Sequence, residues 1–283
     1  MYAIVRKTSN AVFLKNLGVN LSYADISCPD SLEQFVFPKI DAFFHCAARM
    51  KFTNWPQLYK TNVVGTQNIC KLALKLGVDR FIYLSSVAVV SGNKEIPIKP
   101  DFRYNPTNIY GLSKVEAEKE VLEFRNKGLR VAILRPCSVY GEVDPRLDPI
   151  FFLLRHRLFP LVNGGNAKWH MVYVKNVVNA LLLALRQDEL LRGAYFVADD
   201  DILTLREIFT ILSRTIKIRP PLILPVGLTP LLKNIPYLGK KLEVFINDRI
   251  LDMTGIKSLG YKAEFKTEES LIKTAQSWLD ARR

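Results

Sequence analysis

The chain has 283 residues, which is enough for one large domain or two smaller ones with a substantial core. Its hydrophobic fraction of 49% and charged fraction of 24% are those of an ordinary globular protein and exclude a disordered chain. The 40 Lys and Arg residues give a net charge of +13 against 27 Asp and Glu, but they are dispersed, and no basic run predicts a nucleic-acid-binding arm.

Short apolar runs alternate with helical patterns through the first half of the chain. Strands are predicted at Tyr2–Val5, Val19–Ala24, Asp41–Cys46, Arg80–Leu84 and Arg130–Leu134. Helices are predicted from Asp30, from Trp55 to Leu76 and from Thr107 to Asn126. Near-continuous apolar strands separated by helices predict an α/β fold with a parallel sheet covered on both faces.

After Pro136 prolines and glycines become frequent, and the pattern becomes less regular. Helices are predicted at Asn176–Arg186 and Leu205–Arg214, with a short strand at Tyr195–Ala198. We interpret this part as a smaller C-terminal α/β lobe that closes over the carboxyl edge of the sheet.

The longest apolar stretches are Val177–Leu185 and Pro220–Leu232, and they are too short or too interrupted by proline to span a bilayer. No secretory signal precedes them, so a cytoplasmic location is expected, while peripheral membrane contact through the second stretch stays open. The four cysteines show no CxxC spacing, which favours free thiols in a reducing compartment. His45, His156 and His170 are not spaced as metal ligands, so no metal is predicted.

The strongest chemical signal is the segment Tyr110-Gly-Leu-Ser-Lys114. Tyr110 and Lys114 are four residues apart near the start of a long helix, so they share one face. A lysine ammonium near a phenol favours the phenolate, which makes Tyr110 a candidate general base near neutral pH. The pattern is short and also occurs in helices by chance, so it needs support from other residues.

Two further polar residues give that support. Ser86 follows the predicted strand Arg80–Leu84, and open α/β sheets place their ligands at the carboxyl ends of parallel strands. A serine there can hydrogen-bond the oxygen that Tyr110 deprotonates. Asn62 lies within a largely apolar helical pattern and could hold a water that links Lys114 to solvent, although a surface or turn position explains it equally well.

Several motifs, taken together and in order, resemble the extended short-chain dehydrogenase/reductase superfamily of NAD-dependent epimerases and dehydratases. They are HCAA at 45–48, TNVVGTQN at 61–68, YLSSVAVVSG at 83–92, YGLSK at 110–114, LRPCSVYG at 134–141 and WHMVYVKNVVNALLLAL at 169–185. Within the superfamily, GEVDPRLDP at 141–149 looks most like the 3β-hydroxysteroid and sterol dehydrogenase branch. Dihydroflavonol-reductase-like enzymes and nucleotide-sugar epimerases are close relatives.

The resemblance implies a Rossmann-like doubly wound sheet at residues 1–140. It assigns residues 141–283 mainly to a substrate-binding lobe, with segments around 170–200 returning to the core. It further implies a catalytic triad of Ser86, Tyr110 and Lys114, with Asn62 as a fourth member. Tyr110 would exchange a proton with the substrate hydroxyl during hydride transfer, Ser86 would orient the oxygen, and Lys114 would stabilise the phenolate and hold the ribose.

The same resemblance assigns the cofactor and substrate contacts. The cofactor would be held by Asp25 and Ile26 at the adenine, by Ala47 and Ala48 at the strand end, by Pro136 and Ser138 beside the nicotinamide, and by Tyr110 and Lys114. Candidate substrate-wall positions are Val90, Ser91, Tyr140 and Trp169.

Arg6 and Lys7 follow the first predicted strand, where a NAD-selective relative would usually carry an acidic residue. A basic pair suits a 2′-phosphate and slightly favours NADP over NAD, whereas an ordinary surface turn is the alternative interpretation.

The superfamily begins with a strand, a glycine-rich turn and a helix, and this sequence has no counterpart of them. Neither GxG nor GxxG occurs among its 14 glycines, so the usual pyrophosphate anchor is missing. The chain would start at the second strand, without the strand that normally lies between Tyr2–Val5 and Asp41–Cys46. We expect a fragment, a degenerate product, or a protein that repairs the sheet in another way, for example with a partner chain.

The sequence thus predicts an NAD(P)-dependent oxidoreductase that acts on a secondary alcohol or ketone of a sterol-like or other alicyclic small molecule. A nucleotide-sugar epimerase or dehydratase is the alternative enzyme, and a non-catalytic scaffold or inactive fragment is the alternative of another class. The resemblance allows a homodimer formed through the helices at 55–76 and 107–126. Neither the substrate nor the activity of this chain follows from the sequence.

Overall fold

The computed structural model describes residues 1–283 except 34, 36, 51–53, 143, 229–244 and 283. The chain forms two compact units, each made of separate stretches of sequence. The first unit comprises residues 1–92, 103–135 and 184–194, and the second comprises residues 93–102, 136–183 and 195–283.

The strands that begin in the first unit are short, and the pairs β1–β2, β3–β4 and β4–β5 are parallel. They are β1 (Tyr2–Val5), β2 (Asn20–Tyr23), β3 (Ala42–His45), β4 (Arg80–Leu84), β5 (Val131–Pro136) and β8 (Ala194–Val197). One sheet has the order β1-β2 and the other β3-β4-β5-β8, and β5 and β8 run from the first unit into the second. Parallel pairing with intervening helices is the doubly wound, Rossmann-like α/β arrangement that the alternating pattern predicts.

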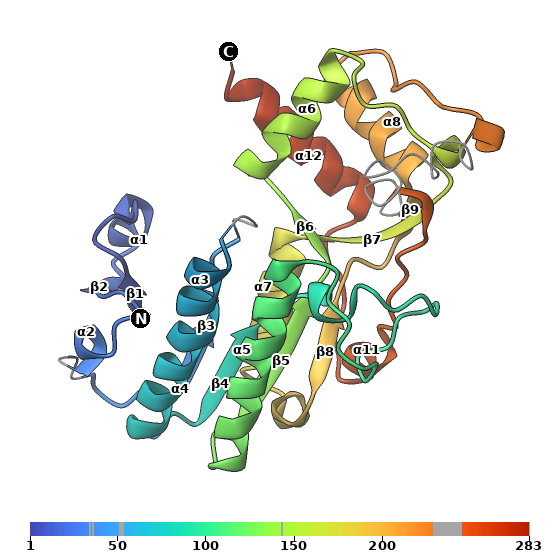
Figure 1. The fold of residues 1–283 in the computed structure, drawn as a ribbon. Coiled ribbons are helices and arrows are strands. Elements are labelled where there is room, and N and C mark those ends of the chain that lie inside the picture. Colours follow the sequence, from blue (N-terminus) through green and yellow to red (C-terminus); the bar gives the residue numbers. More distant parts are fainter. Residues whose placement is uncertain (34, 36, 51–53, 143, 229–244, 283) are drawn as a thin grey trace. The chain divides into compact units, whose positions relative to one another are not determined.

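The helices of the first unit connect these strands. They are α1 (Val12–Asn16), α2 (Asp30–Glu33), α3 (Trp55–Leu58), α4 (Gly65–Lys75) and α5 (Ile109–Asn126), with a π-helical segment η1 (Tyr59–Val64) joining α3 to α4 and 3₁₀ turns η2 (Val87–Val90) and η5 (Asp188–Arg192). Figure 1 shows α4 and α5 side by side against the strands β4 and β5, and the two helices contact each other.

The core of the first unit lies between these helices and the sheet. Phe81 and Tyr83 on β4 and Val131 and Ile133 on β5 are fully buried there, and α4 and α5 cover them with Ile69, Leu72, Ala117 and Val121, among others. Burial of such side chains is the main favourable term in folding, so it fixes which face of α5 points inward.

The second unit is a small mixed sheet with helices. Its elements are β6 (Ser138–Tyr140), β7 (Lys168–Tyr173), β9 (Ile202–Thr204), α6 (Asp148–Arg155), α7 (Val174–Leu183), α8 (Leu205–Thr215), α11 (Thr254–Ser258) and α12 (Thr267–Asp280), with 3₁₀ turns η3 (Pro145–Leu147), η4 (Asn163–Gly165) and η6 (Val226–Leu228). β7 pairs parallel with β6 and antiparallel with β9. A capping box formed by Thr204 and Glu207 starts α8.

Most predicted elements occur close to their predicted positions, and three differ in an instructive way. The helix predicted over Trp55–Leu76 contains the π-helical segment η1 in its middle. The helix predicted from Thr107 begins at Ile109, because the Asn108 side chain accepts a hydrogen bond from the Gly111 amide and caps it. The helix predicted to start at Asp30 is only one turn long.

The predicted membrane-contact stretch Pro220–Leu232 reaches residues 229–232, which lie outside the described residues. Within the part of the chain that the structure describes, no helix combines the length and the apolar character needed to cross a bilayer.

Candidate active site

The start of α5, which carries Tyr110, packs tightly against η2, the turn that follows Ser86. Ser86 lies two residues beyond β4, is half-buried, and its hydroxyl accepts a hydrogen bond from the Ala88 amide at 3.2 Å, which starts the 3₁₀ turn η2. Next to Tyr110, a Cβ on Gly111 would stand 2.6 Å from the Ala88 carbonyl oxygen. The close approach of the two backbones therefore requires glycine and places the start of α5 against the segment that follows Ser86.

The face of α5 that packs on the sheet carries Tyr110 and Lys114, as their four-residue spacing predicts. Both side chains are buried. The Lys114 Nζ donates to the Leu84 carbonyl oxygen at 2.9 Å and lies 4.3 Å from the centre of the Tyr83 ring. Lys114 is thus held at the end of β4, immediately before the two serines.

Burial strongly perturbs Lys114. Loss of solvation lowers the pKa of its ammonium to about 7, while the charges of Glu118 and Cys46 act in the opposite direction. A lysine with such a pKa changes its charge in the neutral range, which is typical of functional sites more than of structural lysines.

Asn62 lies on η1, and its side chain joins two parts of the site. Its Oδ1 accepts from the Arg49 amide at 2.7 Å, while Nδ2 donates to the Arg49 carbonyl at 3.0 Å and to the Ser113 hydroxyl at 2.9 Å. Ser113 in turn donates to the Tyr110 carbonyl oxygen at 2.7 Å. The Asn62 side chain therefore connects the segment after β3 to the first turn of α5. These direct contacts differ from the role predicted from the sequence, in which Asn62 holds a water molecule. π-Helical segments such as η1 are frequent at functional sites.

His45, the last residue of β3, is also buried. One of its ring nitrogens, Nε2, lies 2.9 Å from the Thr66 hydroxyl. Burial and the neighbouring Lys114 charge lower the pKa of His45 to about 3, so the imidazole is neutral throughout the physiological range.

The predicted adenine and strand-end positions lie at the carboxyl ends of β2 and β3. The Asp25 Oδ1 accepts from the Ser27 amide at 2.9 Å and from the Ser27 hydroxyl at 2.7 Å. Ile26 packs closely on α4, where a Cβ on Gly65 would approach its side chain to 2.8 Å. Ala47 and Ala48 are exposed directly after β3, in the segment that Asn62 holds through Arg49.

Arg6 and Lys7 are exposed in the turn after β1. The Ser27 hydroxyl, and further the positive charges of Lys60 and Arg6, hold the pKa of Asp25 below its ordinary value. The structure therefore brings Arg6 close to Asp25 across the parallel pair β1–β2 and adds Lys60 from η1 to this edge.

Val90 and Ser91, two of the predicted substrate positions, belong to the first unit. Val90 is buried, and the Ser91 hydroxyl is 2.9 Å from the Thr107 hydroxyl, just before α5. Both therefore lie within the segment that connects Ser86 to Tyr110.

The other predicted site residues belong to the second unit. Pro136 is buried and Ser138 is exposed on β6. Tyr140 is buried, and its hydroxyl donates to the Asp199 carboxylate at 2.8 Å. Trp169 is half-buried on β7 and stacks on the Phe245 ring at 5.9 Å.

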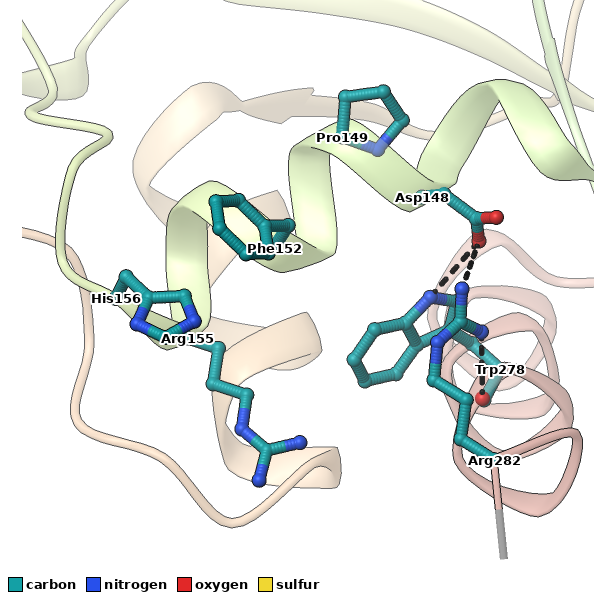
Figure 2. A pocket seen from close by; sticks show the side chains of 7 residues that line it. All are labelled: Asp148, Pro149, Phe152, Arg155, His156, Trp278 and Arg282. Carbon is teal, nitrogen blue, oxygen red and sulfur yellow. Dashed lines mark hydrogen bonds and ion pairs between the residues drawn. The ribbon is translucent and has the colours of Figure 1, made fainter.

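A cavity of about 520 Å³ in the second unit lies between α6 and α12 (Figure 2). Figure 2 shows the Asp148 carboxylate between Trp278, whose indole N–H donates to it at 3.1 Å, and Arg282 at 2.7 Å. The other residues that line it are Pro149, Phe152, Arg155 and His156. None of the predicted site residues is among these seven.

A buried polar cluster around Glu118 was not predicted from the sequence. The Glu118 carboxylate, one turn after Lys114, binds Ser85, Tyr104 and Arg135. Its signal was the spacing of Tyr110, Lys114 and Glu118 along one face of the helix, which the neighbouring glutamates of the same helix obscured.

Comparison with known proteins gives the family of this chain. The sequence pattern of the NAD dependent epimerase/dehydratase family matches residues 1–198. The UDP-glucose 4-epimerase of Vibrio cholerae is 27% identical over 295 aligned positions that cover 98% of this chain and 88% of that protein. The mouse sterol-4-alpha-carboxylate 3-dehydrogenase, decarboxylating, is 28% identical over 178 positions, which cover 57% of this chain and 48% of that protein.

Solved structures show the same fold. The UDP-glucose 4-epimerase of Thermotoga maritima, crystallised with UDP-glucose, superposes with a TM-score of 0.80 at 22% identity, covering 100% of this chain and 91% of that one. RMD from Pseudomonas aeruginosa, complexed with NADPH, gives a TM-score of 0.75 at 20% identity and covers 99% of each chain. With the family pattern spanning residues 1–198 and this fold, the chain belongs to the NAD dependent epimerase/dehydratase family, within the extended short-chain dehydrogenases/reductases.

Proposed function

We propose that this chain carries out NAD(P)-dependent hydride transfer at a secondary alcohol or ketone, with Ser86, Tyr110 and Lys114 as its catalytic residues. The observation that carries the proposal is the convergence of these residues. Tyr110 and Lys114 share the buried face of α5, Lys114 binds the last carbonyl of β4, and Ser86 follows that strand. These residues lie at the carboxyl edge of a parallel sheet, which is where α/β proteins bind their ligands.

The chemistry assigned to the chain is proton transfer and orientation. In the oxidising direction the Tyr110 phenolate takes the proton of the substrate hydroxyl, so that the C–O bond becomes a carbonyl as hydride leaves the carbon. The Ser86 hydroxyl donates to the same oxygen and orients it. The Lys114 ammonium stabilises the phenolate electrostatically, and Asn62 fixes the backbone of Tyr110 through Ser113.

A nicotinamide cofactor, when bound, accepts or returns that hydride. The residues of this chain suit the adenine end and the nicotinamide end of such a cofactor. Asp25 and Ile26 at the edge of β2 suit an adenine, with a carboxylate for its amino group and an apolar contact for its ring. The exposed Ala47-Ala48 segment allows a close backbone approach, and Pro136 and Ser138 are proposed contacts near the nicotinamide.

NADP(H) is the proposed form of the cofactor. Arg6 and Lys7 are exposed in the turn after β1, and the positive charges of Arg6 and Lys60 both act on Asp25. Guanidinium and ammonium groups in such a position favour a 2′-phosphate through charge-assisted hydrogen bonds.

The cofactor proposal is tested by measuring NADPH and NADH affinity in Arg6→Ala and Lys7→Ala variants. We expect NADPH binding to weaken by about 10-fold and NADH binding to stay within about 2-fold, because only the 2′-phosphate contact is lost. Lys15→Ala, which removes an exposed charge on α1, is the matched control. Equal losses for both cofactors would contradict the NADP assignment.

The proposed substrate is a sterol-like or other alicyclic alcohol, with Val90, Ser91, Tyr140 and Trp169 as candidate contacts. A nucleotide-sugar epimerase or dehydratase is the second candidate. It is favoured by the Vibrio cholerae epimerase, which aligns with 98% of this chain, whereas the mouse sterol dehydrogenase aligns with 57%. The first step, hydride removal from a secondary alcohol, is the same in both.

Incubation of the chain with NAD or NADP and either hydroxysteroids or UDP-sugars separates the candidates. A dehydrogenase accumulates reduced cofactor and a ketone, whereas an epimerase inverts the sugar carbon without a net change in NADH absorbance. Cofactor binding without any turnover would favour the non-catalytic alternative. A homodimer through residues 55–76 and 107–126, and peripheral membrane contact, stay predictions that sedimentation and vesicle binding test.

A further inference from the structure

Glu118 is the most deeply buried carboxylate near the proposed triad. Its side chain is fully buried in the middle of α5. Oε1 accepts from the Arg135 Nε at 2.9 Å and from the Ser85 hydroxyl at 2.5 Å, and Oε2 accepts from the Arg135 Nη2 at 2.6 Å and from the Tyr104 hydroxyl at 2.8 Å. Both oxygens are therefore saturated by hydrogen bonds, as a buried charge requires.

These partners connect Glu118 to the ends of two strands. Ser85 immediately precedes Ser86, and its amide donates to the Leu134 carbonyl oxygen at 2.7 Å, next to Arg135 on β5. One carboxylate on α5 thus fixes the segment after β4, the end of β5 and the loop residue Tyr104 in one arrangement. A shift of α5 along the sheet would break all of these contacts together.

Glu118 also lies one helical turn from Lys114, on the same buried face of α5. The titratable groups that act on Lys114 are Glu118 on α5, Cys46 and His45 at the end of β3, and Tyr83 on β4, and Tyr110 lies one turn before it on the same buried face. His45 is neutral at physiological pH, and only Glu118 among them is a carboxylate.

We propose that Glu118 is a positioning residue of the Ser86–Tyr110–Lys114 site: its carboxylate locks the strand end that carries Ser86 against α5 and supplies the negative charge that keeps the buried Lys114 protonated. The inference rests on the proposed function for its catalytic meaning. Arg135 binds both oxygens of the carboxylate, which holds the buried Glu118 ionised in the core. Burial lowers the pKa of Lys114 to about 7 even against the opposing charges of Glu118 and Cys46, so loss of the Glu118 charge would lower it further and discharge the ammonium near neutral pH.

The test is a titration of Lys114 itself in the whole chain, followed by nuclear magnetic resonance of ¹³C-labelled lysine side chains, with Lys114→Met to assign the signal. In Glu118→Gln the midpoint should fall by about one pH unit or more, because the stabilising charge is removed. Glu116→Gln is the matched control, since it removes the same charge two residues away, where Glu116 pairs with Lys119 at the surface. That control should shift the midpoint by less than about 0.3 unit.

A second variant keeps the test valid if Glu118→Gln fails to fold, since it leaves Arg135 unpaired in the core. Glu118→Gln combined with Arg135→Met removes both charges, and neutral replacement of a buried ion pair is usually tolerated. The Lys114 midpoint should still fall in this double variant. A midpoint equal to that of the native chain in either folded variant would overturn the proposal and leave Glu118 with a purely structural role.

The titration is independent of turnover, so failure of the proposed function would not be mistaken for failure of this inference. Where turnover is measured, the alkaline limb of kcat/KM should move to lower pH in Glu118→Gln by the same amount as the Lys114 midpoint, because that limb would report loss of the ammonium. A uniform fall in kcat/KM at every pH, without movement of the limb, would contradict the assignment.

Discussion

Lys114 is the residue whose state decides the chemistry of the proposed site. It is 1% exposed, and its ammonium donates to a neutral group, the Leu84 carbonyl, and lies near the face of the Tyr83 ring. Burial of a charge with so little solvation is unfavourable, and the cost appears as the lowered pKa. The proposed function of Lys114 would therefore be maintained at the expense of stability.

Replacing Lys114 by Met should therefore stabilise the chain in a pH-dependent way. Because the pKa is about 7 in the folded chain and 10.5 in the unfolded chain, the penalty is complete below pH 7 and is relieved between pH 7 and 10.5. We expect Lys114→Met to raise the unfolding free energy by about 2–4 kcal/mol at pH 6 and by much less at pH 10. Denaturant unfolding at the two pH values measures it, and a constant difference would contradict the lowered pKa.

At this scale the sequence alone predicted the face of α5 that holds Tyr110 and Lys114, because helical spacing fixes it. It did not predict the contacts of Asn62, since they depend on how the segment after β3 meets α5 in space. Glu118 could have been found from its four-residue distance from Lys114. Only packing shows that it is buried whereas Glu116 is not.

The contact between α5 and η2 is the element-level feature that assembles the site. η2 follows Ser86, and α5 begins with Asn108 as its cap and has Gly111 in its first turn. The backbone of Ala88 lies where any larger side chain at position 111 would have to go. The separation between Ser86 and Tyr110 therefore depends on this one glycine.

Gly111→Ala should displace the start of α5 and weaken the fold. The new methyl group would meet a carbonyl oxygen at 2.6 Å, so a backbone must shift, at a cost of about 1–3 kcal/mol that exceeds the helix preference of Ala of about 1 kcal/mol. Gly227→Ala is the control, because its Cβ would meet nothing within 4 Å. Thermal unfolding compares the two, and a stabilised Gly111→Ala variant would show that the contact is not tight.

The elements themselves were largely predictable because apolar strands and capped helices leave local signals. The π-helical segment η1 was not predictable. Its backbone hydrogen bonds span one residue more than those of an α-helix, and no local sequence signal marks that difference. The inward position of Asn62 also depends on tertiary contacts. Its side chain is 1% exposed and makes three hydrogen bonds, all to residues outside η1.

At the scale of the molecule, the sheet pairing is uneven. Among the described strands, β1 pairs with β2 alone, whereas β4 lies between β3 and β5 in the other sheet. Two-stranded sheets are only marginally stable in water. The central residues of β4 and β5 are fully buried, whereas those of β1 and β2 are only partly buried.

Amide hydrogen exchange should show this difference directly. Amides of β1 and β2, such as those of Ile4 and Leu21, should exchange at least about 100-fold faster than those of Ile82 and Ile133 in the buried strands, because local opening of β1–β2 exposes little apolar surface. Mass spectrometry of peptic fragments resolves the two regions. Equal protection would mean that β1–β2 is stabilised by contacts beyond those of the described residues.

The α/β class and the strand positions followed from the alternation of apolar runs and helical patterns. The sequence also predicted that Tyr2–Val5 and Asp41–Cys46 are not direct neighbours, and β1 and β3 indeed belong to different sheets. The strand register and the pairing of β7 with both β6 and β9 depend on long-range contacts that no local pattern encodes.

The most direct test of the account is hydride transfer by the Tyr110→Phe variant, measured with whichever alcohol or UDP-sugar the chain turns over. Loss of the phenol should lower kcat/KM by about 10²–10⁴-fold, while cofactor affinity stays within about 3-fold, because only proton transfer is removed. Tyr59→Phe, an exposed tyrosine of η1, is the control and should keep native activity. A Tyr110→Phe variant with native kcat/KM would contradict the proposed mechanism.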